Sequence, residues 1–163
     1  MSNKTPNDIP LEFTFPSHEA LMNILLTGTL LKRTARSFFR SAPISEAEFN
    51  LLMALYHSEL PLSQIDLSER LLVDKSNVTS LIDKVQRSKL IKRNAVAGDR
   101  RRYHITLTEA GRRCVDTVEP GYQKLVAQVM DSLSEADCRS LVRLTRKVRQ
   151  GLRTADTSFT PEG

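Results

Sequence analysis

Apolar and polar positions change their spacing three times between Ser63 and Thr108. Two short stretches repeat apolar residues at helical spacing, and two later stretches alternate apolar with polar residues as β-strands do. Ser63 and Asp66 form a weak capping box for the first helical stretch. Its apolar positions are Ile65, Leu67, Leu71 and Leu72. The pattern predicts a helix, a turn, a second helix and a β-hairpin.

The second helical stretch follows Asp74, a favourable N-cap residue. One apolar stripe at i, i+3, i+4 and i+7 is formed by Val78, Leu81, Ile82 and Val85. The remaining side chains are short polar or charged groups: Lys75, Ser76, Asn77, Thr79, Ser80, Asp83, Lys84 and Arg87. Such groups near a helix N-terminus can reach base edges and phosphates in a major groove. Taken alone, this face fits an ordinary solvated helix better.

Apolar helices are predicted on both sides of this central region. A helix over residues 17–40, capped by Ser17, carries a broad apolar stripe of Leu21, Ile24, Leu25, Leu31, Ala35, Phe38 and Phe39. Ser45 and Glu48 form a strong capping box for the next helix, which ends near His57. The stripe of the first helix is broader than a small core can cover, so we expect a second copy of the chain to cover it.

Two more helices are predicted after the hairpin. The first, capped by Thr108, should run to about Ser132 with Pro120 inside it, so the helix either kinks or splits there, and we favour a kink. The last helix starts at Ser134 and should bury Leu141, Leu144, Val148 and Leu152.

Charge is concentrated in the hairpin. The chain has a net charge of +5, and residues 89–102 alone hold six basic residues against the single acid Asp99, a surplus of the same size. Three consecutive arginines are usually a solvated run. Here Gly98 permits a turn between strands, and the strand that follows alternates Tyr103, Ile105 and Leu107. A basic turn beside a polar helix is the electrostatic footprint expected for a polyanion.

One block of residues carries a family resemblance. Asp99-x-Arg101, Ile105, Leu107-Thr108 and Gly111, preceded by LSERLLVDKSNVTSLIDKVQRSKLIKR, resemble the winged-helix core of the MarR family of bacterial transcriptional regulators, over roughly residues 45–150. The resemblance implies a mainly α fold with a small β-hairpin wing. In that fold a winged helix-turn-helix core is flanked by N- and C-terminal dimerisation helices.

The resemblance also implies roles for individual residues. Residues 74–87 would be the recognition helix, Arg100 and Arg101 would reach the minor groove, and Asp99 would hold the wing arginine in place. Two positions depart from the family pattern. Ser80 stands where many relatives have a long basic residue, and Lys89 stands where glycine usually ends the recognition helix. Keeping the left-handed conformation at Lys89 costs on the order of 1 kcal/mol, unless the turn is built differently.

These inferences divide the chain into five segments. We expect a flexible arm over residues 1–16, dimerisation helices over 17–44 and 109–153, a winged helix-turn-helix domain over 45–108, and a disordered tail over 154–163. The expected partner is double-stranded DNA, bound by a homodimer. The residues expected to contact DNA are Lys75, Ser76, Asn77, Thr79, Ser80, Lys84, Arg87, Arg100, Arg101 and Arg102.

A small aromatic or phenolic effector is a further expectation. The resemblance implies a pocket between the first, second and fifth helices, where such ligands release DNA in many relatives. An aromatic acid needs apolar walls and one cation, which makes Arg36, Phe39, Tyr56 and His57 candidates. Phe39 and Tyr56 fit the hydrophobic core equally well.

Other functions find less support. The three histidines are scattered, and no HExxH or GxSxG motif is present, which argues against an enzyme. The two cysteines, Cys114 and Cys138, are not spaced like a metal site and are read as reduced structural thiols, so no metal or cofactor is expected. Neither a long apolar run nor a signal peptide occurs, which favours a cytoplasmic location. A winged helix that contacts protein or RNA remains the alternative function.

Overall fold

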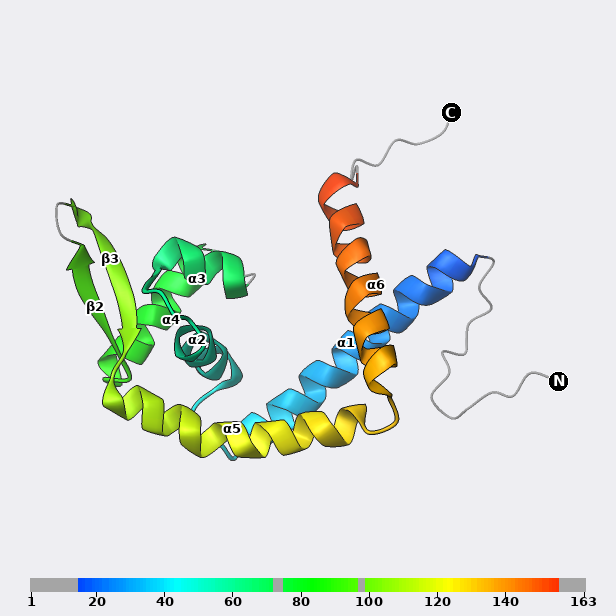
Figure 1. Cartoon of the computed structure of the whole chain (residues 1–163), viewed down its shortest axis with the longest axis horizontal. Helices are drawn as coiled ribbons and strands as arrows, with labels where there is room; N and C mark the ends of the chain where they lie inside the picture. Colours follow the sequence, from blue (N-terminus) through cyan, green and yellow to red (C-terminus); the bar gives the residue numbers. More distant parts are fainter. Residues whose placement is uncertain (1–14, 72–74, 97–98, 156–163) are drawn as a thin grey trace. The chain divides into compact units, whose positions relative to one another are not determined.

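The computed structural model describes residues 15–71, 75–96 and 99–155, with the backbone alone at 75, 76, 96 and 99–102. The elements, in chain order, are α1 (Pro16–Phe39), α2 (Glu46–Tyr56), β1 (Leu62–Ser63), α3 (Gln64–Leu71), α4 (Lys75–Arg87), β2 (Ile91–Val96), β3 (Asp99–Leu107), α5 (Glu109–Met130) and α6 (Glu135–Thr154). In Figure 1, β2 and β3 form a hairpin that extends beyond α3 and α4. The predicted mainly α fold with a small hairpin wing is confirmed.

The chain separates into two compact units, residues 1–120 and 121–163. The core of the first unit consists of fully buried side chains from α2, α3, α4, β3 and α5: Phe49, Leu51, Leu52, Leu67, Val78, Ile82, Val85, Ile105 and Val115. The stripe predicted for α4 is therefore confirmed at Val78, Ile82 and Val85. Ile65, one of the apolar positions that predicted α3, is 57% exposed. Residues two positions apart on a helix point about 200° away from each other around its axis. Ile65 therefore cannot face the core on the same side as Leu67.

Among the described residues, helix starts follow the predicted caps with one exception, and the Asp74 cap predicted for α4 lies outside those residues. Ser45 and Glu48 form the predicted capping box of α2, with the Ser45 N–H donating to Glu48 Oε2 at 2.8 Å. Ser63 and Asp66 do the same for α3. The prediction that Ser17 caps α1 is wrong, because α1 starts at Pro16 after Phe15 and has no side-chain cap. The fixed φ of proline suits a first helical position, where its missing N–H costs nothing.

The sheet holds one strand more than predicted. β3 lies between β1 and β2, antiparallel to both, with Leu62 opposite Ile105 and Arg93 opposite Ile105 on the other side. A two-residue strand after Pro61 has no periodicity of its own, which is why the sequence pattern missed it. Because β1 leads directly into α3, its pairing with β3 attaches the base of the wing to the helix-turn-helix.

Lys89 ends α4 in a left-handed conformation, with φ of 60°. The Lys89 N–H donates to Gln86 O at 2.8 Å and the Leu90 N–H to Val85 O at 3.2 Å, the paired bonds of a Schellman motif. The glycine-like turn is therefore kept despite the lysine, at a cost of about 1 kcal/mol. Next to this turn, a Cβ added to Gly111 would lie 2.1 Å from Leu90 O, so only glycine lets α5 approach the wing base this closely.

The C-terminal helices differ from prediction in two respects. α5 is continuous through Pro120, which rules out a split, and it ends at Met130 rather than near Ser132. In α6, capped by Ser134 as predicted, the apolar side chains expected to be buried are exposed: Leu141, Leu144, Val148 and Leu152. Among the described residues no helix is long and apolar enough to cross a membrane.

The predicted ends of the chain lie mostly outside the described residues. Of the expected arm, residues 1–14 fall outside, whereas Pro16 already belongs to α1. Of the expected tail, residues 156–163 fall outside, and Thr154 is the last residue of α6.

Candidate nucleic-acid interface

α4 presents its polar face away from the buried stripe. Asn77, Ser80, Lys84 and Arg87 are exposed on it, while Val78, Ile82 and Val85 face the core. Asn77 lies in the first turn, where a short amide can approach a base edge. For Lys75 and Ser76 the structure gives the backbone only, in that same turn, and Asp74 lies outside the described residues. The polar face of α4 is thus open to solvent along the described part of the helix.

Thr79 links the two helices of the helix-turn-helix. The Gln64 side-chain amide, at the start of α3, donates to Thr79 Oγ1 at 2.6 Å. Thr79 is also half-buried. Its position therefore supports a role in fixing α3 against α4, and its predicted contact with DNA stays a prediction.

Lys84 forms an ion pair with a buried carboxylate. Its Nζ lies 3.3 Å from Glu48 Oε1 in α2, and the Glu48 side chain is only 8% exposed. Burial alone would raise the pKa of Glu48, but the hydrogen bonds from Ser45 and the Lys84 ammonium outweigh burial and hold that pKa below its usual value. The sequence predicted the Glu48 cap but not this partner, which lies 36 positions away along the chain.

We predict that Glu48→Gln will destabilise the protein at pH 7 by about 1 to 2 kcal/mol, because glutamine keeps the capping geometry but loses the charged bonds. The folded-state pKa is below the unfolded one, so this stabilisation is complete above the usual glutamate pKa and is lost as pH falls through the folded-state pKa. The difference in unfolding free energy between parent and variant should therefore shrink below about pH 4.5.

Urea unfolding at pH 7 and at pH 3.5 measures that difference. Glu46→Gln removes the same charge from the same helical turn and serves as the matched control. A difference between parent and Glu48→Gln that stays constant with pH would contradict the assigned ionisation.

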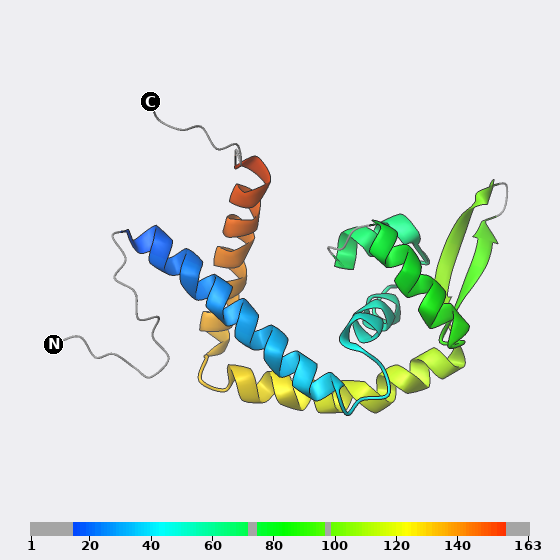
Figure 2. The same ribbon diagram turned by 180° about the vertical axis from the view of Figure 1, so that it is seen from behind.

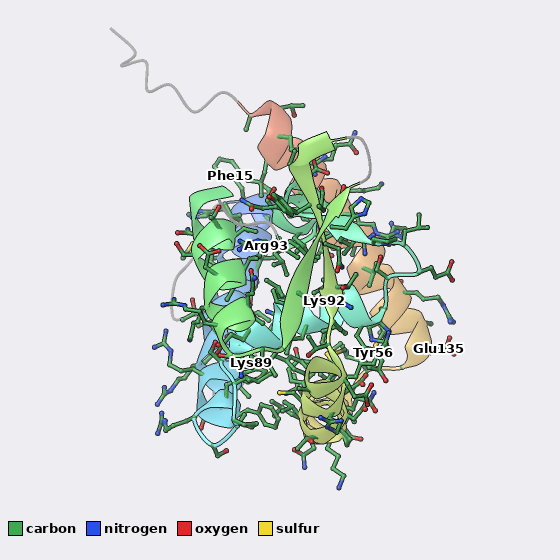
Figure 3. All side chains as sticks on the ribbon, turned by 90° about the vertical axis from the view of Figure 1, so that its left-hand side faces the viewer. Phe15, Tyr56, Lys89, Lys92, Arg93 and Glu135 are labelled. Carbon is green, nitrogen blue, oxygen red and sulfur yellow. The ribbon has the colours of Figure 1, made fainter. Side chains whose placement is uncertain are left out.

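Arg93 connects the wing to α4. Its Nη2 donates to Asp83 Oδ1 at 2.5 Å and its Nη1 to Gln86 Oε1 at 2.7 Å. Figure 3 shows Arg93 between the hairpin and α4, with Lys92 on the neighbouring position of the strand. From the sequence, Arg93 counted only as one charge of the basic hairpin. A charged residue ten positions after an acid gives no local signal of pairing.

The tip of the wing carries the densest predicted charge. The backbones of Arg100, Arg101 and Arg102 lie at the start of β3, and their side chains lie outside the described part of the structure, as does that of Asp99. On β2, Lys92 is exposed, and Asn94 donates from its amide to Thr106 Oγ1 at 2.9 Å across the hairpin. The assignment of Asp99 to orient the wing arginine stays a prediction.

Of the candidate ligand residues, Arg36 and Phe39 lie in the last turn of α1, and Tyr56 and His57 lie at the C-terminal end of α2. Phe39 is buried, with its ring centroid 5.3 Å from that of Phe49, so it belongs to the core. Arg36 is exposed on the last turn of α1. The structure therefore favours the core explanation for Phe39.

Tyr56 and His57 form a polar group with α5. The Tyr56 hydroxyl donates to Asp116 Oδ1 at 2.9 Å, and this bond, with the aspartate charge, raises the pKa of Tyr56 above its usual value. His57 Nε2 lies 4.0 Å from Glu119 Oε1, and the His57 side chain is 62% exposed. These contacts tie the C-terminal end of α2, the helix that also carries the buried Glu48, to α5.

The surroundings of Cys114 disfavour a reactive thiol. Burial raises the pKa of the Cys114 thiol, and the nearby Glu48 charge raises it further, which disfavours the reactive thiolate. Within the described residues, no group of three or more histidine, cysteine, aspartate or glutamate side chains could hold a metal ion.

Comparison with known proteins gives consistent matches. Residues 43–102 match the model described as MarR family. The HTH-type transcriptional repressor NicR of Pseudomonas putida is 27% identical over 152 residues, which cover 91% of this chain and 95% of NicR.

Two solved structures resemble this chain over most of their length. The MepR–DNA complex of S. aureus is 25% identical with a TM-score of 0.71, covering 86% of this chain and 99% of MepR. BpsR of Bordetella bronchiseptica, in a structure concerned with the regulation of its DNA binding by 6-hydroxynicotinic acid, is 26% identical with a TM-score of 0.62, covering 76% of this chain and 98% of BpsR.

Proposed function

This chain belongs to the MarR family of transcriptional regulators, and we propose that it acts as a homodimeric repressor that binds a pseudo-palindromic operator. The observation that carries the proposal is the exposed polar face of α4 beside the basic β2–β3 hairpin. In a dimer, two α4 helices would enter successive major grooves about one helical turn apart, and the two wings would lie over the flanking minor grooves. A protein that acts on the chromosome would work in the cytoplasm.

The test compares two DNAs with the full chain. Duplexes tiled from the region upstream of its own gene are titrated by fluorescence anisotropy against a scrambled duplex, from 50 to 300 mM salt, a range over which phosphate contacts change affinity strongly. We expect one duplex to bind at least about 10³-fold more tightly than the scrambled one, with affinity for both falling steeply with salt. Equal binding to all duplexes, or tighter binding to RNA, would favour the alternative of a winged helix used for protein or RNA contact.

We predict a stable dimer, because the described part of a single chain leaves two apolar helix faces uncovered. Exposed large side chains line α1 at Leu21, Ile24, Leu25, Leu30 and Leu31, and α6 at Leu141, Leu144, Val148 and Leu152. Apolar patches of this extent usually mark a protein interface. Sedimentation equilibrium at low micromolar concentration, where a stable dimer persists, should give twice the chain mass of 18.4 kDa.

A pair of α6 variants tests where the dimer forms. Leu144→Asp places a charge among the exposed apolar residues and should shift the protein toward monomer. Gln150→Asp adds the same charge to α6 at a polar position and should leave the mass unchanged. A parent chain that sediments as a soluble monomer would remove the dimer from the proposal.

We also predict release of the operator by a small aromatic acid or phenol. The proposal is supported by the named ligand of the BpsR structure and by the residues Arg36, Tyr56 and His57 on α1 and α2. An effective ligand should weaken operator binding by about 1 to 3 kcal/mol of coupling free energy, or roughly 5- to 150-fold. The measurement is operator affinity with and without each member of a panel of aromatic carboxylates, phenols and hydroxypyridines.

A variant separates a ligand effect from general salt or pH effects. Arg36→Gln should reduce the response to a carboxylate ligand while operator affinity without ligand stays the same. Arg33→Gln removes a charge one turn earlier on α1 and should respond like the parent. If the whole panel leaves operator affinity unchanged, the protein is better described as a constitutive DNA binder.

A further inference from the structure

We propose that Arg93 is a positioning residue that locks the wing to the recognition helix, and that this lock determines how strongly the protein prefers its operator over other DNA. The inference rests on the proposed function and adds a specificity-determining contact to it. The contact consists of Arg93 in β2 with Asp83 and Gln86 in α4.

The direction of Arg93 follows from the sheet. Arg93 is the cross-strand partner of Ile105, and directly paired residues point to the same face of a sheet. Ile105 is fully buried against the helices, so Arg93 also faces α4. Its immediate neighbour, Lys92, points to the opposite face and is exposed. The Arg93 side chain is 26% exposed, compared with 48% for Asp83.

The chemistry of the contact makes it rigid. Asp83 and Gln86 are three positions apart on α4, which places both acceptors on one side of the helix. The two ends of the Arg93 guanidinium donate separately to these two acceptors, at 2.5 and 2.7 Å. A planar fork held at both ends fixes orientation as well as distance, which a lysine ammonium cannot do. The strand that carries the wing is therefore held at one position along α4.

The same contact neutralises Arg93, so that its charge contributes little to the attraction of DNA. Asp83 carries the opposite charge and lies within hydrogen-bond distance, so the pair has little net charge to offer a phosphate. The functional value of the pair is geometric. A wing that can shift relative to α4 still meets the phosphate backbone, but it cannot place its minor-groove contact in register with the major-groove contacts of one particular sequence.

Three variants and a double mutant test the lock by the affinity ratio of operator to scrambled DNA. Arg93→Ala, Arg93→Lys and Asp83→Ala should each lower this ratio by about tenfold, which corresponds to a typical coupling between residues in contact. The double mutant Asp83→Ala/Arg93→Ala should lower it no further than either single change, because the two residues act as one unit.

Asp83→Ala gives the sharpest result, because an electrostatic role and a positioning role for Arg93 predict opposite changes in operator affinity. Removing a negative charge from the DNA-facing side should strengthen binding to every duplex if Arg93 acts as a phosphate contact. If Arg93 positions the wing, operator binding should weaken relative to scrambled DNA. Lys92→Ala is the matched control: it removes one positive charge from the opposite face of the same strand and should leave the ratio unchanged.

The outcomes separate this inference from the proposed function. If the parent protein shows no preference for any duplex, the proposed function is wrong and the inference falls with it. If the parent discriminates and both Asp83→Ala and Arg93→Lys keep the parent ratio, the inference alone is overturned. Should Arg93→Ala fail to fold by circular dichroism, the other two single variants decide the matter.

Discussion

Replacing Arg101 with alanine should weaken binding to operator and to non-operator DNA together, by about 100-fold. Arg101 lies near the start of β3 in the wing, where a long and permanently charged side chain can enter a minor groove. A charge-assisted hydrogen bond contributes about 1.5 to 3 kcal/mol, and a dimer has two wings, so the loss should reach at least about 3 kcal/mol. The minor groove distinguishes little beyond A·T from G·C, which is why both DNAs should be affected.

The dependence on salt identifies the cause of that loss. Each wing that no longer neutralises a phosphate should flatten the slope of log affinity against log salt by about one unit. Arg139→Ala is a suitable control, because it removes the same charge from α6, where Arg139 is paired with Glu135. If Arg101→Ala binds both DNAs like the parent, the wing is not the electrostatic anchor, and the basic hairpin must serve another partner.

Local patterns predicted most of the fold. The stripe of Val78, Ile82 and Val85, the box of Ser45 and Glu48, and the cap at Ser134 depend on residues within eight positions of one another, so periodicity and capping rules suffice. Ile65 shows the limit of that reasoning, since an apolar residue on a short helix need not face the core.

Pairings between distant elements could not be predicted in this way. Strand β1, the Glu48–Lys84 ion pair and the Arg93–Asp83 contact all join parts of the chain that become neighbours only after folding. In the candidate interface, sequence reasoning identified the helix and the hairpin and counted Thr79 and Lys84 among the DNA contacts. The structure shows that Thr79, Lys84 and Arg93 have partners inside the protein. The polar face of α4 therefore divides into residues that hold the helix and residues that are available to DNA.

Asn77 is the residue of that second group with the clearest expected effect. It is exposed in the first turn of α4, and an asparagine amide can donate to and accept from the edge of an adenine in the major groove. Asn77→Ala should weaken operator binding by about 1 to 3 kcal/mol for each half-site, while binding to scrambled DNA and the salt slope stay close to those of the parent. This result would be the opposite of that for Arg101→Ala, which lowers affinity for both DNAs and changes the slope.

The competing explanation is that Asn77 stabilises the start of α4 rather than contacting a base. In that case Asn77→Ala should lower the thermal unfolding temperature and weaken binding to both DNAs, because a frayed helix start loses phosphate contacts as well as base contacts. Asn50→Ala makes the same chemical change at an exposed position of α2 and controls for general effects of the substitution. Anisotropy titrations of both duplexes, together with unfolding temperatures, distinguish the two. If Asn77 contacts a base, Asn77→Ala should lower the preference for operator over scrambled DNA. Its unfolding temperature should then change no more than that of the Asn50→Ala control.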